Sequence, residues 1–349
     1  MFFLRHFTSL LVFGAVVFTG CSLVDEDFGD CGEDFKLNYE LQLVTNMRTE
    51  IQTVFDLQAD LQLATSLQEH FEEVFTDHAH DVDLSFYDTT MPLERLEHME
   101  VEMDASHSSY ILNLPGRDYM HLCAANLAAE PFVSLRDDQR CASARLVQIP
   151  EVKDTLSPHT TGIFTARKHL LLDKTKDQFI EVNLYMVNAA TALVLDVEDA
   201  PSVKDIKVFL NGFADGFSIA DSTYSFNSDY IVRTVMLPAV PGSAELCFTS
   251  CHFPSKDVDS SIKGVIDTDE PFISEESEEA LWQWRVYATL EDNTITESIL
   301  YVHAPLRAGQ LKVVKGRIHA DGAASTDDRL VGVSVCLDWQ PGMEHDIPL

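Results

Sequence analysis

Apolar and polar residues alternate strictly over several segments of the chain. In the first such segment, Leu37, Tyr39, Leu41 and Leu43 fall on one side and polar residues on the other. Successive side chains of a strand point to opposite faces of a sheet, so this period predicts a β-strand with one buried face. The same pattern predicts strands over residues 82–86, 110–114, 180–186, 206–210, 282–290 and 331–339. Strands with one wet face are typical of antiparallel sandwiches.

One segment has a helical period instead. Between residues 60 and 75, Leu61, Ala64, Leu67, Phe71 and Phe75 recur at intervals of three or four residues. Such spacing places apolar side chains along one stripe of a helix. The sequence therefore predicts an all-β chain with a single helix inserted into its first domain.

The length of 349 residues suits two sandwich domains better than one. Alternation lapses between residues 145 and 157, close to Pro150 and Pro158. We therefore expect an N-terminal domain over residues 35–157 and a C-terminal domain over 158–349. Residues 267–279 are strongly acidic and are expected to form a surface loop.

The N-terminal segment has the features of an export signal. The apolar stretch from Phe7 to Phe18 is shorter than the roughly 20 residues that a spanning helix needs. It leads into Thr19-Gly20-Cys21, which resembles a lipobox. We expect residues 1–20 to be a lipoprotein signal peptide, Cys21 to carry lipid, and residues 21–34 to be an acidic tether.

The formal charge of −33 excludes some partners. Loss of residues 1–20 removes only Arg5 from the 24 basic residues, so the mature balance is 23 − 57 = −34. Binding to nucleic acid or adsorption on anionic lipid needs clustered Lys and Arg, and no such cluster appears. Attachment to a membrane is therefore expected to come from the N-terminal lipid.

Besides Cys21 the chain has six cysteines, an even number that allows 15 complete disulfide patterns. They are Cys31, Cys123, Cys141, Cys247, Cys251 and Cys336. Four residues of an extended strand span roughly 13 Å, too far for a bridge from Cys247 to Cys251. Buried free thiols and one or two disulfides both remain open, and both are favoured over a zinc site.

Two constellations suggest chemistry, but each has a simpler explanation. The run from Asp77 to Asp83 holds two histidines among carboxylates and could bind a metal, but a polar loop before a strand is favoured. Trp282 and Trp284 could form a sugar-binding platform, but they share the phase of a buried strand face. Nucleophile-elbow and phosphate-loop motifs are absent. No catalytic residue, cofactor or metal ion is expected.

Several segments together resemble one family, the fimbrillin-A-associated anchor proteins of protease-assembled pili. The resemblance begins with the lipobox and extends over residues 21–46, 75–88, 114–127, 161–170, 306–318 and 331–342. It implies two transthyretin-like sandwich domains and no catalysis. It also implies a lipid-anchored protein at the base of the fimbrium, on the surface of the outer membrane, with pilin subunits as partners.

The resemblance further implies that the anchor limits filament length through strand complementation, in which a pilin adds an extended segment to an open sheet edge. Cys21 is the one functional residue that the motifs carry over. The alternatives are a surface glycan-binding lipoprotein of a nutrient-uptake system and, less favoured, a lipoprotein hydrolase.

Replacement of Cys21 by Ala tests the lipidation site. Without the thiol no diacylglycerol can be attached, and the signal peptidase that needs the lipidated form should leave the precursor uncleaved. Metabolic labelling with palmitate, followed by gel analysis, should show no label and a larger product. Label that persists in Cys21→Ala would contradict the assignment.

Overall fold

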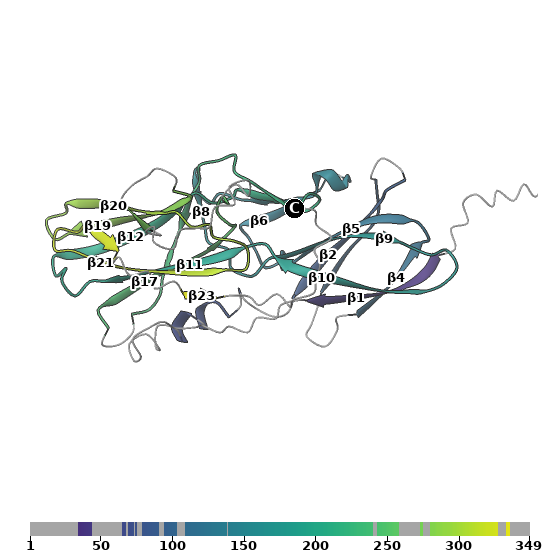
Figure 1. The fold of residues 1–349 in the computed structure, drawn as a ribbon, viewed down its shortest axis with the longest axis horizontal. Coiled ribbons are helices and arrows are strands. Elements are labelled where there is room, and N and C mark those ends of the chain that lie inside the picture. The colour runs from purple at the N-terminus through teal and green to yellow at the C-terminus, as the bar shows by residue number, and fades with distance from the viewer. Residues whose placement is uncertain are drawn as a thin grey trace, which may run out of the picture.

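The computed structural model describes residues 34–43, 65–67, 69–72, 74, 79–90, 94–102, 109–137, 139–239, 243–257, 273–274, 280–326 and 333–335. The predicted signal peptide and most of the tether lie outside these residues. The described part is all-β, as predicted, and forms an elongated body (Figure 1). No helix within it has the length and apolar character needed to cross a membrane.

A sheet with the strand order β3-β2-β5-β9-β10-β1-β4 forms one end of the body (Figure 1). Its strands are β1 (Asp34–Leu43), β2 (Asp81–Asp88), β3 (Arg95–Glu102), β4 (Ser109–Pro115), β5 (Asp118–Ala125), β9 (Phe164–Leu171) and β10 (Gln178–Met186). β9 and β10 pair only through Tyr185–Thr165 and Met186–Phe164. The sheet therefore divides into two layers, and Leu84 of β2 and Leu184 of β10 belong to one core between them.

Two six-stranded sheets form the second sandwich, at the other end (Figure 1). The first sheet contains β11 (Ala189–Asp196), β16 (Val235–Met236), β17 (Glu245–His252), β21 (Leu311–Ile318), β22 (Ala324–Thr326) and β23 (Val333–Val335). The second contains β8 (Thr155–Leu156), β12 (Val203–Asn211), β15 (Ile231–Arg233), β18 (Ile273–Ser274), β19 (Trp282–Leu290) and β20 (Ile295–Val302). Leu193 and Trp284 belong to the shared core between the sheets.

β11 is the central element of the second sandwich and is buried on both faces. It pairs antiparallel with β17 and parallel with β21. Leu193 and Leu195 face the core of the second sandwich, whereas Ala192 and Val194 belong to the cluster that also includes the first sandwich. A strand in this position reads as one continuous apolar run and not as an alternation.

The inserted helix covers the outer face of the β11 sheet. Residues 65–67 and 69–70 are helical, and Leu67, Phe71 and Val74 are buried with Ala192 and Val313. His70 Nε2 lies 2.9 Å from Thr249 Oγ1 of β17. Figure 1 shows this blue-violet helix beside β17. The predicted helix therefore exists, but it packs on the second sandwich although its sequence position lies in the first half.

A small four-stranded sheet lies between the two ends. It contains β6 (Val133–Arg136), β7 (Arg145–Gln148), β13 (Gly216–Ser218) and β14 (Thr223–Ser225), with a 3-10 turn at Cys141–Ser143. It covers the outer side of the first sandwich, because Phe217 packs in one cluster with Tyr87 and Leu122. Both ends of the molecule therefore add a third layer to the basic sandwich.

The strand pairing changes from one sandwich to the other after Met186, not at the predicted boundary between residues 157 and 158. β9 and β10 still pair with β5 and β1 of the first sheet, whereas the earlier β8 already pairs with β15 of the second sandwich. The stretch between β7 and β9, which includes the short β8, is thus a connection that crosses between sheets. The lapse of alternation therefore reflects a connection between sheets and not a boundary between the two sandwiches.

The strands predicted from alternation coincide with strands of the structure. The predicted strands over residues 82–86, 110–114, 180–186, 206–210 and 282–290 lie within β2, β4, β10, β12 and β19. β1 confirms the first predicted strand, and β23 confirms the middle of the last one. Within the predicted acidic loop, Ile273 pairs with Val302. Leu61, Ala64 and Phe75 of the helix and the ends of segment 331–339 lie outside the described residues.

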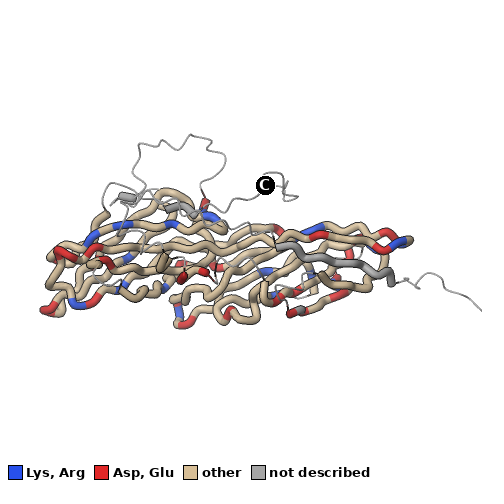
Figure 2. The backbone as a smooth tube through the Cα atoms, turned by 90° about the horizontal axis from the view of Figure 1, so that it is seen from below, with Lys and Arg blue, Asp and Glu red and all other residues tan. Residues whose placement is uncertain are grey.

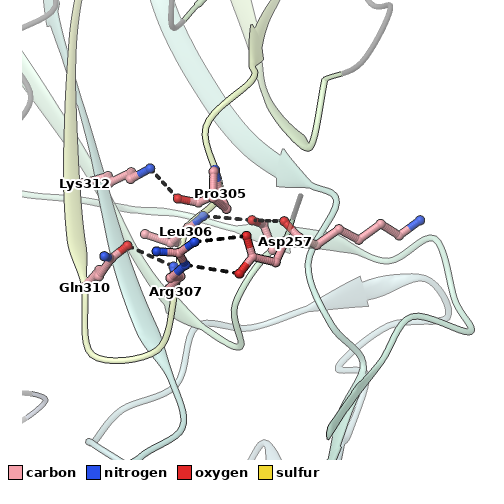
Figure 3. Close-up of polar contacts among 8 residues, drawn as sticks. Asp257, Pro305, Leu306, Arg307, Gln310 and Lys312 are labelled. Atoms are coloured by element: carbon pink, nitrogen blue, oxygen red, sulfur yellow. Dashed lines mark hydrogen bonds and ion pairs between the residues drawn. The ribbon is translucent and has the colours of Figure 1, made fainter. Parts of the chain in front are cut away.

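The loop between β20 and β21 is tied to the chain that follows β17 (Figure 3). Ser255 Oγ accepts a hydrogen bond from the Leu306 amide at 2.9 Å, and Arg307 Nε lies 3.1 Å from Asp257 Oδ2. Lys312 Nζ donates to the Pro305 carbonyl oxygen. Burial lowers the pKa of Lys312 to about 8. These contacts hold the loop in place beside the start of β11, where the Gly309 amide donates to the Asn188 carbonyl oxygen.

The contact between His70 and Thr249 provides a test of the helix position. In a double-mutant cycle of His70→Ala and Thr249→Val, we expect a coupling of about 0.5–1.5 kcal/mol in the free energy of unfolding, typical of one hydrogen bond. Urea unfolding measures it. The exposed Glu72→Ala, combined with Thr249→Val, is the matched control and should show no coupling. Additive effects of His70→Ala and Thr249→Val would contradict this packing.

Three buried histidines predict a loss of stability in acid. Burial lowers the pKa of His121 and of His252 to about 4, and that of His159 to about 3. The unfolded chain binds a proton at each near pH 6.5, so the folded state loses about 1.4 kcal/mol per histidine for each pH unit between roughly 6 and 4. Urea unfolding from pH 7.5 to 5 measures the slope. His121→Gln should reduce it, the exposed His319→Gln should not, and a flat profile would contradict the prediction.

Candidate functional site: the open edge of the second sandwich

The polar run before β2 serves a structural purpose. His80 donates its amide hydrogen to Asn126 Oδ1 at 2.7 Å, and Asp81 Oδ1 accepts hydrogen bonds from the amides of Leu127 and Ala128. Within the described part of the run, a loop at residues 79 and 80 therefore leads into β2, which begins at Asp81 and includes Asp83. Asp77 and His78 lie outside the described residues, as does Cys21.

The paired tryptophans belong to the core. Trp282 is 2% exposed and Trp284 is 0% exposed. The indole nitrogen of Trp282 donates to the Ala304 carbonyl oxygen at 2.9 Å. Neither ring offers a face to solvent, so the core interpretation is confirmed and the sugar platform is wrong.

The described cysteines are buried free thiols, namely Cys123, Cys141, Cys247 and Cys251. As predicted, no bridge joins Cys247 to Cys251. Burial raises the pKa of Cys247 to about 12 and also raises that of Cys123. Because the thiolate is the reactive form, these residues are held in the unreactive state. Cys31 and Cys336 lie outside the described residues.

A groove opens at one edge of the second sandwich. β19 pairs with β12 along its full length, whereas β15 pairs with the other side of β12 only at Phe209–Asn211. Among the described strands none pairs with residues 203–207 on that side. Across the groove, β16 pairs with β17 only at two positions, Val235–Thr249 and Met236–Phe248. The edge therefore presents backbone groups that a further strand could pair with.

The groove has a volume of about 750 Å³ and an apolar floor. Its apolar lining residues are Val197, Ala200, Val203, Ile206, Val208, Phe209, Met236, Leu246 and Phe248. Met236 is 57% exposed and Val235, beside it on β16, is 45% exposed. An extended segment with alternating apolar side chains would bury this surface.

The rim of the groove carries three basic side chains, Lys204, Lys207 and Arg233, together with Asp205. Lys204 Nζ donates to Asn293 Oδ1 at 3.1 Å, and Arg233 Nη1 lies 3.0 Å from Glu151 Oε2. In a chain with a net charge of −33, such a rim is a local exception. Glu151 balances Arg233, so Lys204 and Lys207 are the side chains that could complement carboxylates on a ligand.

Elsewhere charges of both signs are interspersed along the described backbone (Figure 2).

No protein-family profile matches the sequence, and no curated protein matches it. Solved structures do share the fold. A Bacteroides thetaiotaomicron protein that has been suggested to bind polysaccharide superposes with a TM-score of 0.52 at 10% identity, covering 84% of this chain and 98% of that one. A Bacteroides ovatus protein that has been suggested to be an adhesin gives 0.50 at 10% identity, covering 75% and 76%. These two show a common fold.

The fimbrial anchor protein Mfa2 from Porphyromonas gingivalis is also similar, with a TM-score of 0.49 at 11% identity, covering 83% of this chain and 94% of that one. A similarity of that size adds no weight to the assignment of the fold.

Sequence patterns could not reveal the groove. Ile206 and Val208 were recognised as the apolar face of a strand, but the groove exists because β15 ends its pairing at Phe209. That depends on the register between segments more than twenty residues apart. The one local signal was the pair of lysines, Lys204 and Lys207, in a chain dominated by acids.

Proposed function

We propose that the chain is a non-catalytic surface lipoprotein that holds a fimbrial filament to the outer membrane and limits its length. Cys21 would supply the membrane attachment, and the second sandwich would bind the terminal pilin. The single observation that carries this proposal is the open edge of β12, where unpaired backbone, an apolar floor and a basic rim occur together.

Strand complementation explains why these three features belong together. An extended pilin segment would pair with residues 204–207 through its backbone, since both partners then satisfy N–H and C=O groups. Its apolar side chains would enter the groove beside Ile206 and Met236. Acidic side chains on the segment would meet Lys204 and Lys207. The proposed ligand of the groove is thus an extended, acidic segment of a pilin subunit.

The shared fold and the N-terminal sequence support the same proposal. The Bacteroides ovatus protein with this fold has been suggested to be an adhesin. The lipobox would keep the N-terminus attached to lipid, which suits a terminal subunit. The sandwich end that carries the groove is remote from β1, the first described strand (Figure 1).

The glycan-binding alternative has lost its sequence evidence, because Trp282 and Trp284 are buried. Glycan binding remains the second function to test, because a protein suggested to bind polysaccharide shares the fold. A hydrolase lacks support, since the buried thiols are unreactive and no nucleophile motif exists. Both alternatives would leave filament attachment unchanged when the gene is removed.

Deletion of the gene in the source organism should release long filaments into the medium. The physical reason is that both the membrane link and the terminal partner are lost. Shear-released filament protein and filament length, measured by immunoblot and electron microscopy, should both rise. Filaments of normal length that stay on the cells would overturn the anchor role.

Charge reversal at the rim tests the groove separately. Lys204→Glu combined with Lys207→Glu should increase filament release, because the repelled acidic segment dissociates faster. Lys176→Glu, an exposed lysine on the turn between β9 and β10, is the matched control and should retain filaments. Equal retention of filaments in both variants would show that the groove does not bind the filament. The anchor role would then be judged by the gene deletion alone.

A further inference from the structure

Three potential metal ligands meet on the edge hairpin of the first sandwich. Asp83 of β2 pairs directly with Glu100 of β3, and His98 lies two residues before Glu100. The ligand atoms of the three side chains all lie within 4.8 Å of one another. Met99, between the two β3 ligands, packs against the first core. His98 and Glu100 therefore share the opposite face, to which Asp83 also projects.

This arrangement brings two carboxylates together beside one imidazole. Two carboxylates directly opposite each other in an antiparallel pair are destabilising. The side chain of Asp83 is only 16% exposed. One imidazole can balance at most one of the two carboxylates, whereas a divalent cation would balance both.

The positions of the side chains are also restrained. His98 Nε2 lies 2.6 Å from Asp83 Oδ2, and Ser85 Oγ donates to Asp83 Oδ1 at 3.3 Å. Ligand atoms on a tetrahedral Zn²⁺, at about 2.1 Å from the ion, are roughly 3.4 Å apart. The three ligand atoms lie within 4.8 Å of one another, which is close to that spacing. The side chain of His98 is 31% exposed and Glu100 is exposed, so an ion can enter from solvent.

We propose that Asp83, His98 and Glu100 form a binding site for a divalent metal ion of the zinc class, with water in the remaining position. One imidazole nitrogen and two carboxylate oxygens are ligands that Zn²⁺ accepts. The ion would link the edge strand β3 to β2 at the point where the carboxylates oppose each other. The site is independent of the groove and of the fimbrial proposal.

The competing explanation is a plain ion pair between His98 and Asp83. The chain contains a matched example, in which His169 Nε2 lies 2.7 Å from Asp118 Oδ1 on neighbouring strands. That pair is not part of any cluster of three ligands among the described residues. His169→Gln therefore removes a comparable histidine without touching the proposed site.

Isothermal titration of the full chain in mild detergent with ZnCl₂ at pH 7.5 tests the proposal. We expect one class of sites that His98→Gln and Glu100→Gln each weaken by about tenfold or more. His169→Gln should bind as the parent does. Zinc taken up by cysteines would be the same in all four proteins and would not create this difference.

Thermal unfolding provides the second readout. Zinc should raise the melting temperature of the parent and of His169→Gln, because an ion that binds only the folded state stabilises it. It should leave His98→Gln and Glu100→Gln unchanged, and their circular dichroism without zinc would show that they fold. Zinc affinity that is equal in all variants, or absent at 1 mM in the parent, would overturn the proposal.

Discussion

Burial of β11 on both faces is the constraint on which the rest of the structure depends. Its side chains from Ala189 to Leu195 are all buried, with alternate residues facing two different cores. One core closes the second sandwich and the other continues beneath the inserted helix into the first sandwich. Because β11 follows β10 after only two residues, the same run of chain joins both sandwiches. A change in this strand would therefore disturb both ends of the molecule.

Because the packing is centred on β11, the edge of the second sandwich at β12 can remain without a pairing strand. The sheet that contains β11 is covered on its outer face by the helix and on its inner face by the tryptophan-containing core. The edge at β12 does not contribute to that packing beyond its inward side chains, so it can present unpaired backbone. In the proposed anchor, a rigid two-sandwich body would thus transmit force from the groove to a lipid on Cys21. The edge hairpin of β2 and β3 would be reinforced separately by metal.

The sequence predicted those strands that have one wet face. β4, β10, β12 and β19 alternate clearly and were recognised; β2 was recognised too, although Ser85 and Tyr87 on its outer face are also buried. β11 was not predicted, because a strand buried on both faces reads as a continuous apolar run. Recognising such a run as a strand would have required knowing that the helix covers the outer face of its sheet. The helix was predicted from its period, but its packing on β17 depends on contacts such as His70–Thr249, across 179 positions of sequence.

The candidate sites could not be predicted for a related reason. The groove depends on where β15 stops pairing, and the ligand cluster depends on the register that places Glu100 opposite Asp83. The run from Asp77 to Asp83 contains one member of the proposed ligand cluster, Asp83, whereas His98 and Glu100 come from the following strand. Local patterns indicate which residues are polar, whereas pairing decides which of them meet.

The central claim is that an extended segment of a pilin adds to the free edge of β12. Hydrogen exchange, followed by mass spectrometry on the full chain with and without its purified filament, tests it most directly. The account predicts that those backbone amides of residues 204–207 that do not bond to β19 exchange more slowly in the complex, while those of β11 exchange slowly in both states. Unchanged exchange at residues 204–207 in a saturated complex would contradict it.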